Sequence, residues 1–499
     1  MEPFDFIVVG GGTAGCVLAA RLSEQPTTRV LLLESGSADL PELVPSPPAW
    51  PSLVGSAANW GDRTVIQSAT DTSAGLPRGR GLGGSSAINA MVFARGHRSS
   101  YDVWPRTSAI GWGFEDLLPF FMRSERTPSP LPGRGSMGPL LVAPASPPNE
   151  VLSACLKAAI QAGHPRAFDI SSGMEEGFAP VDLNIVDGRR QSAADAYLRP
   201  ALNRPNLTVV TDATAHRLRF LGRRCVGVDY SHDGRMLHVE TTREVVLAAG
   251  AIGSAQMLLL SGVGPGSELR DLGIDVVCNL PGVGRNLHDH ARTNLVFRSE
   301  HQVPAPRNNH GEIIGLVRSR PGLPAPDLQI IFIDIAVPSP AGQIDNGFTI
   351  GVCPIAPRSR GRLSLASADP RVAPLLDPNY FGDDRDMQTM LAGLRIAREI
   401  AQMPALDKWR PAEAAPGIVV RTDHELRAYV RATLASYCHP VGTCAMGTTP
   451  ESVVDLALRV HGIGGLRIAD ASVIPSMPSS NTNATVYAIA ERAAHFLQS

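Results

Sequence analysis

Three glycines near the start of the chain, Gly10, Gly12 and Gly15, have the spacing of a loop that binds the pyrophosphate of a dinucleotide. The first glycine allows a tight turn, the second lets the backbone approach the phosphates, and the third lets a helix pack closely on a strand. Glu34 follows at the end of a later apolar run, where its carboxylate can accept a hydrogen bond from a ribose hydroxyl. The pattern predicts a dinucleotide site, but it does not by itself distinguish FAD from NAD.

Two strands and one helix must position these residues. Residues Phe4 to Val9 predict a short buried strand, Thr13 to Leu22 predict the helix that follows it, and Arg29 to Glu34 predict a second strand. The N-terminal end of this helix would then face the phosphates. A strand–turn–helix with a purely structural role is the alternative. The presence of both strands, with the acidic residue Glu34 at the end of the second one, favours the nucleotide site.

Two further segments are rich in glycine and other small residues. The segment from Arg78 to Gly96 is dense in Gly and Ser, so its backbone amides and hydroxyls can wrap a flat ligand with polar edges. The segment from Gly250 to Gly264 follows a predicted strand and puts small residues at the start of a second helix. An ordinary turn before a helix and close helix–sheet packing are the respective alternatives.

The composition is that of an ordered globular protein with room for two or three domain-sized units. Of the 499 residues, 43% are hydrophobic and 18% charged, and the net charge of −2 offers no basic surface for nucleic acid. We expect no membrane span, because no apolar run approaches the roughly 20 residues required. The strand at Phe4 leaves no room for a signal peptide, and seven irregularly spaced cysteines indicate reduced thiols. We therefore expect a cytoplasmic protein.

The order of the predicted elements indicates an α/β protein, α+β overall, with two domains. Strand–helix wiring at both ends of the chain predicts a Rossmann-like nucleotide domain assembled from discontinuous segments. Between about 292 and 436, strand-like runs and one helical run predict a substrate domain with a mainly antiparallel sheet and helices. The predicted nucleotide domain comprises residues 1–136, 171–291 and 437–499, and the predicted substrate domain comprises 137–170 and 292–436.

Seven dispersed segments resemble, in the same order along the chain, the signature segments of the glucose–methanol–choline (GMC) family of flavoprotein oxidoreductases. These segments are Phe4–Gly15, Arg78–Gly96, Gly250–Gly264, Gly282–His290, Ser436–Gly447, Arg467–Pro475 and Asn481–Glu491. The resemblance implies that the nucleotide domain binds FAD and that the enzyme oxidises a small-molecule alcohol to an aldehyde or ketone. It favours an alcohol oxidase that is reoxidised by O2. An alcohol dehydrogenase with another electron acceptor and a flavin-containing enzyme like the hydroxynitrile lyases are the alternatives.

His439 stands in the segment that resembles the family's catalytic-histidine segment, which implies that it is the general base. An imidazole that titrates near working pH can take the hydroxyl proton while the hydride passes from the carbinol carbon to the flavin. Asn483 corresponds by resemblance to the second catalytic position, where a carboxamide would orient the alcohol oxygen. His439 as a core histidine, a metal site with Cys438 and Cys444, and Asn483 as an N-cap are the alternatives. The sequence offers no clear fourth ligand, so we expect no metal.

The resemblance also implies a cofactor site along the signature segments. It comprises Gly10, Gly12, Thr13, Ala14, Gly15, Glu34, Ser35, Arg80, Gly83, Gly84, Ser85, Asn89, Ala90, Met91, Val92, Ala213, Ala249, Gly250, Asp470, Ala471, Asn481, Asn483 and Ala484. Some family members attach FAD covalently through a histidine just before the asparagine of the glycine-rich loop. Ile88 occupies that position here, so we expect non-covalent FAD.

Five residues are predicted to line the substrate pocket: Trp60, Phe93, Glu312, Phe332 and Cys438. Glu312 falls where choline-oxidising relatives use a carboxylate near a quaternary ammonium group. A cation cage also needs aromatic faces, and the residue before His439 is a cysteine. A choline-like substrate is therefore disfavoured, and the sequence leaves the alcohol and the oligomeric state open.

Overall fold

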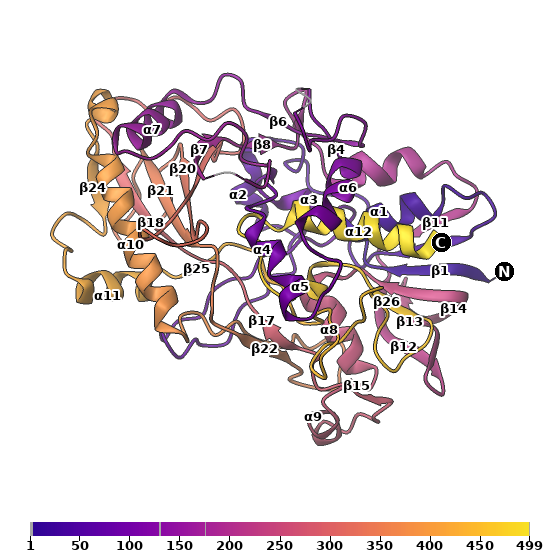
Figure 1. Ribbon diagram of the computed structural model, residues 1–499. Helices are drawn as coiled ribbons and strands as arrows, with labels where there is room; N and C mark the ends of the chain where they lie inside the picture. The colour runs from indigo at the N-terminus through magenta and orange to yellow at the C-terminus, as the bar shows by residue number, and fades with distance from the viewer. Residues whose placement is uncertain (1–2, 129–130, 175, 499) are drawn as a thin grey trace.

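A parallel sheet forms one half of the molecule (Figure 1). In the computed structural model, which describes residues 3–128, 131–174 and 176–498, five strands of this sheet run parallel. Their order is β11 (Leu207–Val210), β2 (Val30–Leu33), β1 (Phe4–Val9), β14 (Arg235–Leu247) and β26 (Leu466–Ile468). These strands come from three distant parts of the chain, which confirms a Rossmann-like sheet assembled from discontinuous segments.

The strand β14 belongs to two structures at once. Its first part forms an antiparallel ribbon with β13 (Arg224–His232), which pairs in turn with β12 (Thr214–Leu221). Polar residues in this part are largely exposed, whereas the final Val245, Val246 and Leu247 are fully buried next to β1. The change from polar to aliphatic sequence therefore marks the point at which the strand enters the core.

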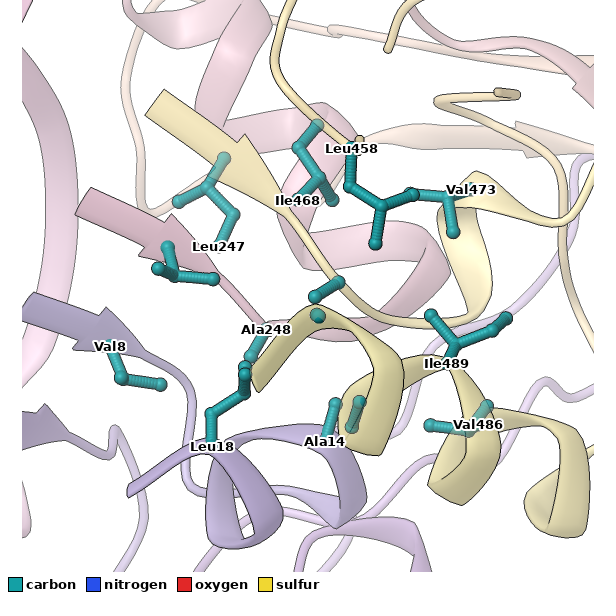
Figure 2. Close-up of a cluster of buried hydrophobic side chains, with 14 of the residues drawn as sticks. Val8, Ala14, Leu18, Leu247, Ala248, Leu458, Ile468, Val473, Val486 and Ile489 are labelled. Atoms are coloured by element: carbon teal, nitrogen blue, oxygen red, sulfur yellow. The ribbon is translucent and has the colours of Figure 1, made fainter. Parts of the chain in front are cut away.

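Two helices from opposite ends of the chain pack side by side against the parallel sheet. The helices α1 (Thr13–Leu22) and α12 (Asn483–Gln498) are in contact, and their small and aliphatic residues Ala14, Leu18, Val486 and Ile489 belong to one buried cluster (Figure 2). Small side chains at this contact let the two backbones approach. The last helix of the chain thereby reaches the loop that begins the first one.

An antiparallel sheet forms the other half of the molecule. Its strands are β24 (Ala412–Ala415), β18 (Ala291–Arg298), β21 (Gly347–Pro354), β20 (Leu328–Ile333), β19 (Ile313–Val317) and β7 (Gly177–Pro180). The helices α7 (Glu150–Gln161) and α10 (Asp384–Ala401) pack on one face of this sheet (Figure 1). The short strand β25 (Ala435–Ser436) pairs with β18 and leads into the His439 segment. The expected antiparallel substrate sheet with helices is confirmed.

One domain boundary differs from the expectation. The strand β7 lies within 171–291, the stretch predicted for the nucleotide domain, yet it pairs with β19 at the end of the substrate sheet. The segment FAP in this strand carries no signal that separates an edge strand of one sheet from that of the other, so the sequence could not place it. The boundary therefore lies further along the chain than predicted.

Further helices and short strands complete the two halves. The remaining helices are α2 (Trp50–Leu53), α3 (Ser85–Ile88), α4 (Ser99–Asp102), α5 (Trp104–Thr107), α6 (Phe114–Ser124), α8 (Gly250–Leu260), α9 (Gly266–Asp271) and α11 (Asp423–Thr433). The short strands used below are β3 (Val92–Phe93), which pairs with β8 (Asp182–Leu183), and β17 (Arg285–Leu287), which pairs with β22 (Gly361–Ser364). Within the described ranges, no helix is long and apolar enough to cross a bilayer.

Candidate active site

The glycines of the first loop allow unusually close backbone contacts. A Cβ atom on Gly15 would lie 1.8 Å from the carbonyl oxygen of Gly10, and one on Gly84 would lie 2.7 Å from the Cα of Gly12. Gly83 donates its N–H to the carbonyl of Gly11 at 2.8 Å, which joins the two glycine-rich loops. The two loops therefore form one continuous backbone surface with no side chain at its closest points.

The start of α1 is free to bind an anion. Gly12 occupies the N-cap position and supplies no side-chain cap, and the first turn contains no acidic residue. The amides of Thr13, Ala14 and Gly15 therefore point from the helix start without a side-chain acceptor to receive them. A pyrophosphate group fits this position, because it supplies both the acceptor oxygens and the negative charge that the helix end favours.

Glu34, the residue predicted to bind the ribose, directly follows β2. Its carboxylate accepts hydrogen bonds from the backbone amides of Gly11, Gly36 and Gly81 at 2.6, 2.8 and 2.9 Å. Burial raises the pKa of this carboxyl, and the three amide donors oppose that shift. Only one amide donates to Oε2, so this oxygen can still accept a hydrogen bond from a ribose hydroxyl.

Other predicted cofactor residues surround these loops. Asp470 accepts hydrogen bonds from the amides of Gly250 and Ser472, at 2.9 and 2.8 Å, and from the hydroxyl of Ser254, so it joins β26 to the start of α8. The amide of Ala213 donates to the carbonyl of Glu34 at 2.9 Å. The donor set and the uncapped helix start fit FAD, because they provide for its phosphate and ribose groups.

His439 lies at the junction of the two halves, on the loop that follows β25. Cys438 precedes it with φ = 64°, so the chain turns sharply there, and Cys438 is an exposed residue whereas His439 is buried. The buried carboxylate of Asp289 holds this turn. It accepts the backbone amides of His439 and His290, both at 2.8 Å, and the hydroxyls of Ser436 and Tyr380.

A chain of hydrogen bonds fixes which nitrogen of His439 carries a proton. His290 Nε2 lies 3.3 Å from the carbonyl oxygen of Ile355, which can only accept, so this nitrogen is protonated. Burial lowers the pKa of His290 to about 3, so the ring is neutral and its Nδ1 is an acceptor. His439 therefore donates from Nδ1 to Nδ1 of His290, at 2.9 Å. The neutral His439 ring is left with an unprotonated Nε2.

The unprotonated nitrogen faces Asn481. The carboxamide Nδ2 of Asn481 lies 3.1 Å from Nε2 of His439 and donates to it. Gln329 orients this carboxamide, since its Nε2 donates to Oδ1 of Asn481 at 3.3 Å. The pKa of His439 lies well below its ordinary value because of burial, and the neighbouring His290 and Arg292 lower it further. The imidazole is thus a neutral acceptor at physiological pH.

The structure places Asn481 against His439, and not Asn483 as predicted. Asn483 begins α12, and its Oδ1 accepts a hydrogen bond from the hydroxyl of Thr13 at 2.9 Å. It therefore belongs to the nucleotide half of the site. The two asparagines lie two residues apart and have the same side chain. The point at which the helix begins therefore decides which of them turns toward the imidazole.

Two predicted pocket residues, Phe93 and Phe332, belong to the hydrophobic core. Phe332 alternates with its neighbours on β20, points to the face covered by α7 and α10, and stacks on Phe178 with ring centroids 5.4 Å apart. Phe93 on β3 is fully buried in the core of the nucleotide domain. The position of Phe332 contradicts its assignment to the pocket, because its ring fills the core between the sheet and its helices. The assignment of Phe93 to the pocket stays a prediction.

Two further pocket candidates are engaged elsewhere. The carboxylate of Glu312 is 1% exposed and accepts from the amide of Asn149 at 2.6 Å and from Nδ2 of Asn308 at 2.8 Å. Trp60 is 38% exposed and lies between two guanidinium groups, of Arg78 and Arg80, at 4.5 and 5.0 Å. Of the five candidates, Cys438 alone adjoins His439 in the described chain.

Sequence reasoning missed Gln329 and the role of Asp289 in the site. Gln329 lies on β20 between apolar residues, and a single polar residue in such a strand is a signal that the buried face meets a polar partner. Asp289 and His290 lie within the signature segment Gly282–His290, but their contacts with His439 depend on a loop conformation that the sequence does not show. Among the described residues, no group of three or more His, Cys, Asp or Glu side chains could hold a metal ion.

Comparison with known proteins gives two matches to the family described as GMC oxidoreductase, over residues 4–292 and 357–490. The chain is 39% identical over 540 residues to the mitochondrial choline dehydrogenase of Mus musculus, covering 100% of this chain and 90% of that protein. It is 36% identical to the alcohol dehydrogenase [acceptor] of Pseudomonas putida, with 99% and 95% coverage. Among solved structures, pyridoxine 4-oxidase from Mesorbium loti superposes with a TM-score of 0.95 at 33% identity, covering 99% and 98% of the two chains.

Proposed function

Since the chain belongs to the family of GMC oxidoreductases, we propose that His439 is the general base with which it oxidises an alcohol to an aldehyde or ketone. The enzyme is FAD-dependent and acts on the CH–OH group of its donor. FAD supplies the acceptor for the hydride that leaves the carbinol carbon. The residues of this chain must then bind the alcohol, orient its oxygen and take its hydroxyl proton.

The hydrogen bond between Asn481 and His439 carries this proposal. A hydroxyl group both donates and accepts, so an alcohol can replace this bond with two of its own. Its hydrogen is then donated to Nε2 of His439, and its oxygen accepts from Nδ2 of Asn481. The proton therefore has a defined destination, since Nδ1 of the same ring already donates to His290.

Anaerobic reduction of the bound flavin tests this function. A panel of primary alcohols should include substrates that bleach the flavin absorbance of the wild-type holoenzyme. His439→Ala should slow that reduction by about a hundredfold or more, because it removes the proton acceptor. His424→Ala, which changes an exposed histidine on α11, is the matched control and should reduce at the wild-type rate. Full reduction by the His439→Ala variant would contradict the proposal.

We propose further that the flavin is held without a covalent bond and is reoxidised by O2. Ile88 cannot form a covalent flavin link, and the similar pyridoxine 4-oxidase supports an oxidase. Acid precipitation should release the flavin into the supernatant, and turnover in air should yield one hydrogen peroxide per aldehyde. The P. putida relative, a dehydrogenase, supports the alternative of another electron acceptor. Turnover with an artificial acceptor but without peroxide would favour that alternative.

A further inference from the structure

An arginine without an anionic partner lies beside the proposed active site. Arg292 is on β18, next to Ala435 of β25, and its guanidinium carbon lies 5.6 Å from the ring centroid of Tyr437. The ring of Tyr437 in turn lies 4.7 Å from that of His439. Arg292 is therefore one aromatic ring away from the base, and its influence reaches the imidazole, whose pKa it lowers.

The guanidinium of Arg292 makes no hydrogen bond or ion pair with any of the described residues. Its Nε is buried without a hydrogen-bond partner, although the residue as a whole is only half-buried. A partly buried guanidinium normally pairs with a carboxylate, because its five donors lose water when it is covered. Its contact with Tyr437 is with the ring face, and the Tyr437 hydroxyl is itself buried without a hydrogen-bond partner among the described residues.

More buried polar atoms without partners share the sheet face of Arg292. Asn294 follows two residues later on β18, so it lies on the same face as Arg292. Asn294 pairs with Gly351 on β21, and Gly351 pairs with Ile331 on β20, so this face continues across the three strands. Alternation along β20 puts Gln329 on that same face. Asn294 Oδ1 and Gln329 Oε1 are both buried without a hydrogen-bond partner. The face turned toward His439 thus combines one positive charge with unsatisfied amide groups.

The carboxylates near this face already accept hydrogen bonds from other groups of the protein. Asp289 accepts four hydrogen bonds from the His439 loop and its surroundings. Glu312 accepts from Asn149 and Asn308, and Asp334 accepts from His310 at 2.8 Å and from Asn149. A quaternary ammonium group would therefore meet the positive charge of Arg292, whereas Asp289, Glu312 and Asp334 are all engaged in hydrogen bonds within the protein.

We propose that the enzyme selects alcohols that carry a carboxylate or a similar anion, which Arg292 binds, over alcohols that carry a quaternary ammonium group. This inference rests on the proposed alcohol oxidation. A planar guanidinium holds a carboxylate through two parallel hydrogen bonds. Because only the ring of Tyr437 separates Arg292 from His439, the carbinol end of such a substrate can still reach the base. The bound anion also offsets the positive charge that lowers the pKa of His439, so it strengthens the base.

Three alcohols of similar size test this selectivity in the holoenzyme. They are 4-hydroxybutanoate, the neutral 3,3-dimethylbutan-1-ol and choline, each scored by the concentration that gives half-maximal anaerobic flavin reduction. The anion should reach half-maximal reduction at a concentration at least about tenfold lower than the neutral alcohol, and choline at a higher concentration than either. Arg292→Gln should remove the advantage of the anion, and Arg292→Glu should reverse the order. Arg298→Gln, at the exposed end of the same strand, is the matched control and should keep the wild-type order.

A binding measurement separates this inference from the proposed function. Butyrate and tetramethylammonium cannot be oxidised as alcohols, so calorimetric titration of the holoenzyme reports their affinity without turnover. Butyrate should bind at least about tenfold more tightly than tetramethylammonium, and Arg292→Gln should abolish the difference. Equal binding, or an unchanged preference in Arg292→Gln with full flavin content, overturns the inference. Failure of every alcohol to reduce the flavin, with butyrate still bound through Arg292, would instead overturn the proposed oxidation.

Discussion

Asn481 and Asn483 show how much of the site depends on the conformation of single residues. Both are asparagines, but Asn481 precedes α12 and contacts His439, whereas Asn483 begins the helix and contacts Thr13. The histidine itself was predictable, because its type and its signature segment indicate a base. The identity of its partner was not, because two equivalent side chains compete and the fold of the loop selects one.

Substitution of the two asparagines should have different effects. Asn481→Ala removes the donor that faces the base, so flavin reduction should slow by about 10- to 100-fold, the range for a lost hydrogen bond to a charged group. Asn483→Ala should keep the reduction rate within about threefold and weaken retention of FAD, since it loses its bond to Thr13. Anaerobic stopped-flow and flavin content after gel filtration measure the two effects. If instead Asn483→Ala slowed flavin reduction and Asn481→Ala weakened FAD retention, Asn483 would be the substrate-facing residue, as first predicted.

The pKa of His439 predicts the pH dependence of flavin reduction. The neutral ring accepts the proton, and burial together with His290 and Arg292 keeps the pKa well below its usual range. The reduction rate should therefore stay constant through neutral pH and fall only at acid pH, where the ring becomes protonated. Arg292→Gln removes a positive charge, so protonation becomes easier and the acid limb should move to higher pH. Stopped-flow measurement of the reduction rate across pH gives the pH at which the rate falls. If that pH is the same in Arg292→Gln as in the wild type, Arg292 does not act on the base.

At the scale of elements, the alternation of strands decides which residues reach the site. The sequence predicted strands in this region and assigned Phe332 to the pocket, yet the site uses Gln329, three residues earlier on the opposite face of β20. Apolar runs reveal that a strand is buried on both faces, but not which face meets a helix and which meets the other domain. Strands with clear apolar runs, such as β1 and β2, were therefore predictable, whereas the orientation of β20 was not.

Two substitutions on β20 should separate these faces. Gln329→Ala leaves the carboxamide of Asn481 without its orienting donor, so flavin reduction should slow by about tenfold with little change in thermal stability. Phe332→Ala creates a cavity against Phe178 and should lower the free energy of unfolding by about 3–5 kcal/mol with the reduction rate of the folded enzyme unchanged. Thermal unfolding and stopped-flow on both variants give the test. A slowed reaction in Phe332→Ala would place that ring in the pocket after all.

At the scale of the whole molecule, the two sheets meet where the histidines are buried. The pKa of His290 is about 3, and burial also lowers the pKa of His288 and His439 well below the ordinary value of 6.5. Their neutral forms belong to the folded state, whereas the unfolded chain binds protons below pH 6.5. The junction of the domains is therefore sensitive to acid.

Stability should decline as pH falls from 6.5 toward about 3. For His290, each pH unit of this fall lowers the free energy of unfolding by up to roughly 1.4 kcal/mol, because the unfolded state takes up the proton first. His290→Gln removes one such group, so its thermal midpoint should depend less steeply on pH than that of the wild type. Thermal unfolding from pH 7 to 4 measures both slopes. Equal slopes would show that His290 is not the group that takes up the proton on unfolding.

The return of the last helix to the first loop has a consequence for synthesis. The ribosome releases β1, α1 and β2 early, but β26 and α12, which complete the same domain, emerge only with residues 466–498. Before that point the nascent chain already contains every strand of the antiparallel sheet, the last of which is β25. The FAD-binding site is still incomplete at this stage. The complete coenzyme site therefore forms only after β26 and α12 have been synthesised, and a nascent chain stalled before β26 should not retain FAD.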